Sequence, residues 1–112
     1  MAAGTYNLQI DQGSDFAVNL ALKEGGVATD LTSYSARAQM RTTKDAASAA
    51  ATFTCTIMNP TAGTLQMSLP NATSAALDAG LYYYDLEIYT SGDGIVTRIL
   101  EGTVTIDQNV TR

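Results

Sequence analysis

The sequence contains no histidine, no tryptophan and only one cysteine among its 112 residues. Without histidine there can be no Ser-His-Asp or Cys-His catalytic site and no histidine-ligated zinc ion. A single cysteine cannot form a disulfide within the chain, and Cys55 alternates with threonines in "TFTCTI", which predicts a small buried hydrophobic residue. These absences lead us to expect no catalytic residues, no metal, no cofactor and no enzymatic activity.

Basic residues are also scarce, since six Lys and Arg stand against eleven Asp and Glu for a net charge of −5. No basic stripe is available to neutralise phosphates, so we expect neither nucleic acid nor a membrane as a partner. The start of the chain, "MAAGTYNLQI", lacks the basic and apolar regions of a secretion signal, and no stretch approaches the ~20 apolar residues of a membrane helix. We expect a protein that is made and used in the cytosol or in an assembly formed there.

The remaining options for catalysis are weak. A Ser-Lys site is not expected, because both lysines lie next to predicted turns and should be solvated. Asp85 and Glu87 share one face of a predicted strand, but nothing supplies a pocket or a cause for shifted pKa values. A cation-binding cluster of Asp78, Asp85 and Asp93 lacks a loop with ligand spacing.

The composition describes one globular domain, residues 1–112, because 46% of the residues are apolar, 15% are charged and only two are proline. Apolar residues recur at alternate positions in segment after segment, which is typical of an antiparallel all-β domain. About seven or eight strands are expected, with at most one short helical turn. This favours a two-sheet β-sandwich, although periodicity does not distinguish it from a small barrel. The core-facing residues expected are Tyr6, Leu8, Ile10, Phe16, Val18, Leu20, Leu22, Tyr34, Ala36, Ala38, Met40, Phe53, Cys55, Ile57, Leu65, Met67 and Leu69.

The connections between these strands carry further predictions. "KEGGVATD" indicates a turn and loop, and "TTKDAASAAA" an irregular connection. In "NATSAALDAG", Asn71 is expected to cap a single helical turn from which Leu77 points inward. The "SGDG" at 91–94 joins the tyrosine-rich strand to "IVTRILEGTVTI" as a hairpin, in which Gly102 is the expected bulge.

The segment "DAGLYYY" has the spacing D-x-G-x-Y-x-Y and resembles the tyrosine corner of immunoglobulin-type sandwiches. There, a tyrosine near the start of the penultimate strand hydrogen-bonds to the backbone a few residues upstream, and a disulfide cysteine follows two residues later. Asp78, Gly80 and Tyr82 would form the corner, and Tyr84 stands where the cysteine would be. We therefore expect an immunoglobulin-like sandwich whose core is held by packing alone.

The outward half of the same strand is the candidate interface, if Tyr82, Tyr84, Leu86 and Ile88 face the core. Tyrosine offers large contact area at low entropy cost, and arginine can bind carboxylates through two hydrogen bonds. An ordinary solvated face is the alternative. A neighbour's strand could also add to the N-terminal "YNLQI", which has few charges to block pairing. The interface candidates are Tyr83, Asp85, Glu87 and Tyr89, with Arg37, Arg41 and Arg98 as a complementary patch.

Nearly the whole chain resembles the small immunoglobulin-like structural domains of tailed bacteriophages, and is similar to the N-terminal domain of their upper baseplate proteins. The resemblance is carried by "DLTSYSARAQMR" at 30–41, "GTLQMSL" at 63–69, "LDAGLYYYDLEI" and "VTRILEGTVTI", in that order. The phage domains usually have glycine where Ser33 stands. The sequence ends at "DQNVTR" without their helical or receptor-binding extension, which favours a free-standing virion protein.

This resemblance implies assembly rather than chemistry. The expected function is that of a virion structural protein on the head, neck, tail or baseplate, with other virion proteins and copies of itself as partners. The alternative is a host-surface or carbohydrate-binding adhesion module. Against it, sugar platforms commonly combine exposed tryptophan and tyrosine, whereas here tryptophan is absent and the tyrosines cluster on one strand.

Overall fold

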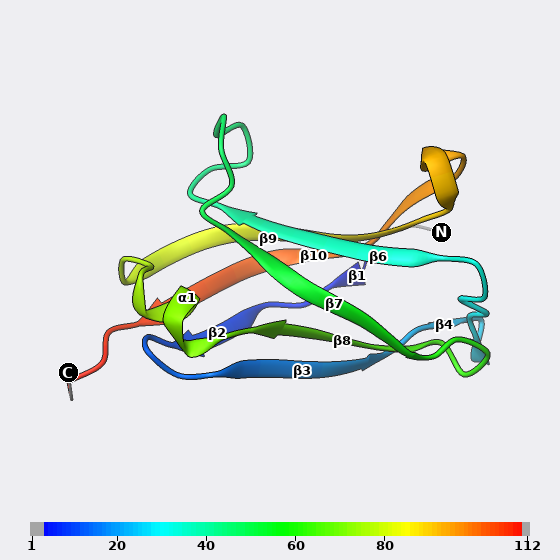
Figure 1. Ribbon diagram of the computed structural model, residues 1–112, viewed down its shortest axis with the longest axis horizontal. Helices are drawn as coiled ribbons and strands as arrows, with labels where there is room; N and C mark the ends of the chain where they lie inside the picture. The colour runs from blue at the N-terminus through cyan, green and yellow to red at the C-terminus, as the bar shows by residue number, and fades with distance from the viewer. Residues whose placement is uncertain (1–3, 111–112) are drawn as a thin grey trace.

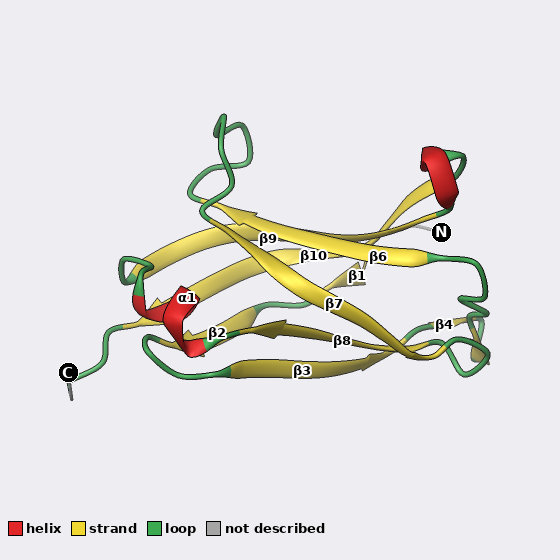
Figure 2. Ribbon diagram, in the orientation of Figure 1, coloured by secondary structure: helices red, strands yellow, loops and turns green. Residues whose placement is uncertain are grey.

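The computed structural model describes residues 4–110, and strands dominate it (Figures 1 and 2). Two short helical segments, α1 (Asn71–Ala75) and the 3-10 turn η1 (Ser91–Asp93), lie between them, where one turn at most was expected. No helix in this described part of the chain has the length and apolar character needed to cross a membrane. The strands are β1 (Gly4–Thr5), β2 (Leu8–Asp11), β3 (Phe16–Ala21), β4 (Lys23–Glu24), β5 (Val27–Ala28), β6 (Ser35–Arg41), β7 (Ala51–Asn59), β8 (Thr64–Leu69), β9 (Gly80–Tyr89) and β10 (Val96–Asp107).

Eight of the strands form one curled sheet in the order β1-β10-β9-β6-β7-β8-β3, and β2 also pairs with β10. The long strand β7 pairs with β6 through its first residues and with β8 through the rest. It runs diagonally across the molecule in Figure 1 and so joins two layers, β6-β9-β10 and β3-β8. These pairings are those of an immunoglobulin-like sandwich. The prediction of an all-β fold is confirmed.

The N-terminal strands depart from the predicted antiparallel pattern, because β1 and β2 both pair parallel with β10. The pairing with β10 is interrupted between these two strands. Tyr6, which was predicted to face the core, lies in the interruption with 44% of its surface exposed. Its N–H donates to the Glu101 carbonyl at 2.9 Å. Leu8 and Ile10 then resume the core face and are buried. The sequence pattern missed this interruption because alternation continues across it.

The segment predicted as a loop at 23–30 contains a separate two-stranded hairpin, β4-β5. Gly25 and Gly26 form its turn with φ of 59° and 80°, a conformation that glycine adopts without the steric cost of a Cβ. The next turn, Leu31 to Tyr34, closes with a hydrogen bond of 2.9 Å and places Ser33 at a φ of 69°. A serine there carries a backbone conformation that favours glycine.

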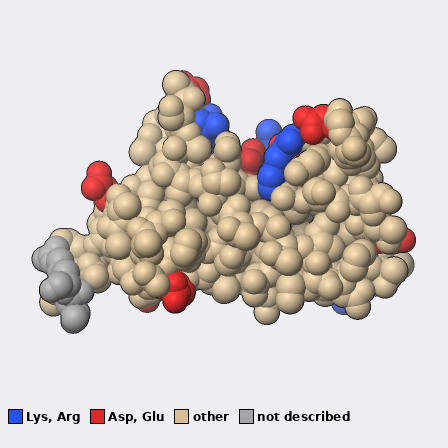
Figure 3. Space-filling model, in the orientation of Figure 1, with Lys and Arg blue, Asp and Glu red and all other residues tan. Residues whose placement is uncertain are grey.

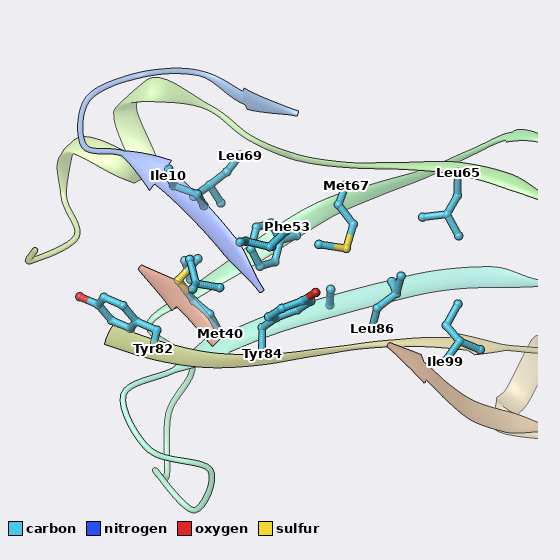
Figure 4. Packing of buried hydrophobic residues seen from close by; sticks show 14 of the residues in the cluster. Ile10, Met40, Phe53, Leu65, Met67, Leu69, Tyr82, Tyr84, Leu86 and Ile99 are labelled. Atoms are coloured by element: carbon cyan, nitrogen blue, oxygen red, sulfur yellow. The ribbon is translucent and has the colours of Figure 1, made fainter. Parts of the chain in front are cut away.

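The core lies between the two layers (Figure 4). Met40, Tyr84 and Leu86 from one layer face Phe53, Leu65, Met67 and Leu69 from the other, and all of them are buried. Phe53 packs edge-on against Tyr84 with ring centroids 6.1 Å apart. Cys55 is only half-buried, and burial raises its pKa to about 11. The predicted core faces of β6 to β9 therefore point inward as expected, but Tyr34, Ala36, Cys55 and Ile57 are only partly buried at the margin of the core.

The helical turn α1 begins differently from the prediction. Its N-cap residue is Pro70, and Asn71 makes no capping bond. Instead, both the backbone N–H and the side-chain amide of Asn71 donate to Asp15, at 2.8 and 2.9 Å. The fully buried Ser74 donates to the Ser14 carbonyl at 2.8 Å and so ties α1 to the loop before β3. Leu77 is buried, as predicted.

The bulge in β10 lies at Ile99, where the register with β9 shifts between Arg98 and Leu100. Gly102, the predicted bulge, pairs regularly with Tyr84. Its lack of a side chain serves another purpose, because a Cβ there would lie 2.3 Å from the Tyr6 carbonyl oxygen. Glycine at 102 allows the chain between β1 and β2 to cross close over β10.

Candidate interaction face

The four outward residues predicted on β9 lie on one face of the sheet. Tyr83, Asp85, Glu87 and Tyr89 are each half-buried and alternate with the buried core residues of the same strand. β9 pairs with β6 on one side and with β10 on the other, so its outward face is the centre of a three-stranded surface. We call the outward side of β6, β9 and β10 the interaction face.

Arg37 is paired within this face rather than free to form a separate patch. It lies opposite Glu87 in the register of β6 and β9, and its Nε donates to Glu87 Oε1 at 2.6 Å. A second nitrogen, Nη1, lies 3.3 Å from Asp93 Oδ1 in η1. The hydrogen bond that Arg37 donates to Glu87 is the main cause that raises the pKa of Arg37. The guanidinium also lies over the Tyr89 ring, 4.4 Å from its centroid, in cation–π geometry.

Arg98 on β10 makes the corresponding pairs on the other side of β9. Its Nε lies 3.4 Å from Asp85 Oδ2, and its Nη1 donates to Glu101 Oε2 at 3.2 Å. Arg37 and Arg98, predicted as part of a complementary patch, therefore lie on the same surface as the tyrosines and carboxylates of β9. Each of these two arginines forms ion pairs with carboxylates of that surface.

Arg41 lies opposite Tyr83 at the end of β6 and supports the loop that follows. Its Nη1 donates to the Ala46 carbonyl at 3.0 Å, and its Nη2 donates to Gln39 Oε1 at 3.1 Å. The loop at 42–50 rises from the sheet beside this point, and the loop that contains η1 rises at the other end (Figure 1). The expected irregular connection is therefore one wall of the interaction face.

A groove of about 530 Å³ lies on the interaction face beside the loop at 42–50, which contributes Lys44 to its lining. In Figure 3, Lys and Arg side chains gather with Asp and Glu in the hollow between the two raised loops. Four of the six basic residues of the chain, Arg37, Arg41, Lys44 and Arg98, belong to this region or its walls. The groove is lined by Thr5, Asn7, Gln39, Arg41, Lys44, Tyr83, Tyr84, Asp85, Glu87, Arg98, Glu101, Gly102 and Thr103.

The predicted corner residues lie at the opposite end of β9 from η1. The Tyr82 hydroxyl donates to the Asp78 carbonyl oxygen at 2.7 Å, which is the backbone bond of a tyrosine corner. Burial is the main cause that raises the pKa of Tyr82. Gly80 stands between the two residues with a φ of 143°. This bond holds the chain where it leaves the turn after α1 and enters β9.

Sequence reasoning missed the role of Tyr84 beneath the groove. Its hydroxyl donates to the Tyr6 carbonyl at 2.5 Å, and burial raises its pKa above the ordinary value. Beside it, Asn7 Oδ1 accepts a hydrogen bond of 3.1 Å from the Thr103 N–H. These two bonds fix the crossing of the N-terminal segment over β10. The residues joined by these bonds are 78 and 96 positions apart in the sequence, so no local sequence pattern could predict them.

The two carboxylates on the outward side of β9 both form ion pairs. Asp85 and Glu87 are each engaged by an arginine. Within residues 4–110, no three His, Cys, Asp or Glu side chains are grouped so that they could hold a metal ion. Asp78, Asp85 and Asp93 do not form such a group in this part of the chain. What the face offers a partner is two half-exposed tyrosines and a fixed array of balanced charges.

Comparison with known proteins finds a structural likeness but no match by sequence. No family model and no curated protein matches the chain. A crystal structure of InlP from Listeria monocytogenes is similar in fold, with a TM-score of 0.50 and 15% sequence identity over 94% of this chain. The chain spans only 28% of the length of that protein. At this level of identity the likeness is one of fold alone.

Proposed function

We propose that this chain is a non-enzymatic structural protein of a tailed-bacteriophage virion, which contacts other virion proteins through the interaction face. The observation that carries the proposal is the arrangement of this face between two raised loops. Tyr83 and Tyr89 are presented on the central strand β9, and the arginines beside them are held by carboxylates of the same chain. Such a surface is ordered before a partner arrives.

Order before binding matters energetically, because association loses about 0.5–1.5 kcal/mol for each long side chain that must be immobilised. Arg37 is held by Glu87, by Asp93 and by the Tyr89 ring, so part of this loss has already occurred on folding. Tyrosine and arginine are also the residue types that most often contribute large shares of interface energy. The face therefore suits a protein that must bind a lattice partner in a fixed orientation.

The resemblance to phage structural domains supplies the identity of that partner class. Its first motif includes Ser33, where the phage domains usually have glycine, and Ser33 adopts a backbone φ of 69° that favours glycine. Its third motif forms the corner and β9, and its fourth forms β10. Three of the four motifs thus fall on the strands that build the interaction face and on the turn that leads into it, whereas the second forms β8 in the other layer. The position of these three motifs supports carrying the virion role over to this chain.

The test is incorporation into particles. Tyr83→Ala combined with Tyr89→Ala removes the aromatic contacts, and we expect the fold to remain and the band of this protein in purified particles to fall several-fold. Val27→Ala combined with Met58→Ala is the matched control, because these exposed apolar residues lie outside the interaction face. Equal incorporation of both double variants at matched expression would contradict the role of the face, and absence of the wild-type protein from particles would contradict the virion role.

A carbohydrate-binding adhesion module is the second candidate, and the groove favours it. Tyr83 lies in the groove together with amide, hydroxyl and carboxylate groups, which is the chemistry that recognises a sugar ring and its hydroxyls. A glycan array with the purified protein separates the two candidates. Saturable binding that Tyr83→Ala abolishes would favour the adhesion module over the virion contact.

A further inference from the structure

The structure assigns a second association surface, the open edge of β3, and we infer that it pairs with β3 of a second copy of this chain. In the order of the curled sheet, β3 is terminal and pairs only with β8 among the described strands. In Figure 1 it runs along the lower border of the molecule with no strand beyond it. The inference is independent of the proposed virion role.

The free edge of β3 has none of the usual protection against strand pairing. Native edge strands are commonly blocked by charges, proline or a bulge. β3 reads "FAVNLA", contains neither charge nor proline, and pairs with β8 in an uninterrupted register from Phe16 to Ala21. By contrast, the N-terminal strand β2, where a neighbour's strand was expected to add, ends at Asp11 and has only four residues. β3 is the longer and less protected edge.

The hydrogen bonds of Leu22 identify which residues face the open edge. Its N–H donates to the Gly63 carbonyl at 2.8 Å, so Leu22 directs its backbone N–H toward the β8 side. Backbone groups alternate in direction along a strand. The even-numbered residues of β3 therefore bond to β8, and Ala17, Asn19 and Ala21 direct their N–H and C=O groups to the open edge. An extended strand paired along this edge would give all of these N–H and C=O groups hydrogen-bond partners.

The charges at the two ends of this edge favour a second copy in antiparallel orientation. Asp15 precedes β3 and Lys23 follows it, and both are exposed. A two-fold axis at Asn19 places Asp15 of one copy opposite Lys23 of the other, twice over. A parallel arrangement would instead place Asp15 beside Asp15, where like charges directly opposite are destabilising.

The same register also brings apolar side chains of the two copies into contact. Directly opposite residues of an antiparallel pair lie on the same face, so Phe16 meets Leu22 and Val18 meets Leu20 of the other copy. All four are only partly buried in one copy and pack at the edge of its core. Pairing therefore extends the core across the two-fold axis as well as the sheet. The small outward residues Ala17 and Ala21 leave the approach clear.

Cysteine cross-linking tests both the pairing and its register. In a Cys55→Ala background, Asn19→Cys would lie opposite its own copy at a Cα separation of about 5.5 Å, which suits a disulfide. Ala17→Cys is the matched control, because its two copies would lie about 13 Å apart along the strands. We expect the first variant to form covalent dimers on oxidation at least about tenfold faster than the second. Equal rates would overturn the register.

The wild-type protein should sediment at equilibrium as a dimer of 11.8 kDa chains. Asn19→Pro removes an edge-facing N–H while the ladder to β8 keeps its bonds, so it should yield a monomer with an unchanged far-UV circular dichroism spectrum. Lys23→Glu should raise the dimer dissociation constant by about tenfold at low salt and by less at high salt. A wild-type monomer at about millimolar concentration, or a dimer that persists in Asn19→Pro, would overturn the inference.

Discussion

Tyr82 and Asp78 are joined by a hydrogen bond of 2.7 Å between the tyrosine hydroxyl and the backbone carbonyl four residues upstream. The tyrosine ring is buried in the core of the sandwich. Its hydroxyl reaches the turn that follows α1. One side chain thus links the core to the entry of β9, the strand that presents the interaction face. The position of Tyr83 and the residues after it depends on this entry.

Tyr82→Phe should therefore lower the free energy of unfolding by about 1 kcal/mol, the net value of one such hydrogen bond. The ring still fills its place in the core, so the loss reports the hydroxyl alone. Urea denaturation followed by circular dichroism measures it. Tyr83→Phe is the control, because the structure shows no hydrogen bond from the Tyr83 hydroxyl among the described residues. Equal stability of the two variants would show that the corner bond contributes nothing.

Gly102→Ala should destabilise the fold by about 1–3 kcal/mol, because an added Cβ would lie 2.3 Å from the Tyr6 carbonyl oxygen and 2.8 Å from its carbon. Both contacts are to backbone, so the crossing segment must move away from β10. Gly4→Ala is the matched control in the same region, where the Cβ would meet Leu100 at an ordinary 3.7 Å. Thermal unfolding compares the two. Similar melting temperatures would contradict the close crossing.

Ser33→Gly should stabilise the protein by up to about 1 kcal/mol, because Ser33 adopts a φ of 69°. Glycine relieves the contact between Cβ and the backbone, and the gain outweighs its larger entropy in the unfolded chain. Ser35→Gly is the control, since Ser35 lies in β6 and glycine weakens a strand. Chemical denaturation should move the two midpoints in opposite directions. A lower midpoint for Ser33→Gly would refute the prediction.

Alternation of apolar residues predicted the strands and their buried faces because side-chain direction in a strand is a local property. It predicted the two faces of β9 residue by residue, from Tyr82 to Tyr89. It also placed the corner, since Asp78 and Tyr82 are close in sequence. These features need no knowledge of which strands are neighbours.

The predictions that proved wrong concern contacts between distant parts of the chain. Gly102 has the sequence signature of a bulge, but its glycine is required by the Tyr6 backbone crossing above it. Asn71 has the signature of a cap, but its amide binds Asp15, 56 residues away. The ion pairs of Arg37 and Arg98 were not predicted either, because they depend on strand order, which places the two arginines on either side of Glu87 and cannot be read from any one segment.

Alkaline pH should destabilise the fold through groups whose pKa values folding raises. Burial raises the pKa of Tyr84 above 10.0 and that of Cys55 from 9.0 to about 11. The unfolded chain therefore releases these protons at a lower pH than the folded chain. The free energy of unfolding keeps its full value below about pH 9 and falls as the pH rises above it. The fall is at most about 1.4 kcal/mol per pH unit for each group. Cys55→Ala should remove the loss that begins near pH 9, and Tyr84→Phe should reduce the loss above about pH 10, although it also removes the bond to Tyr6. Urea unfolding across this pH range measures both, and a free energy of unfolding that stays constant would show that neither group titrates differently in the folded protein.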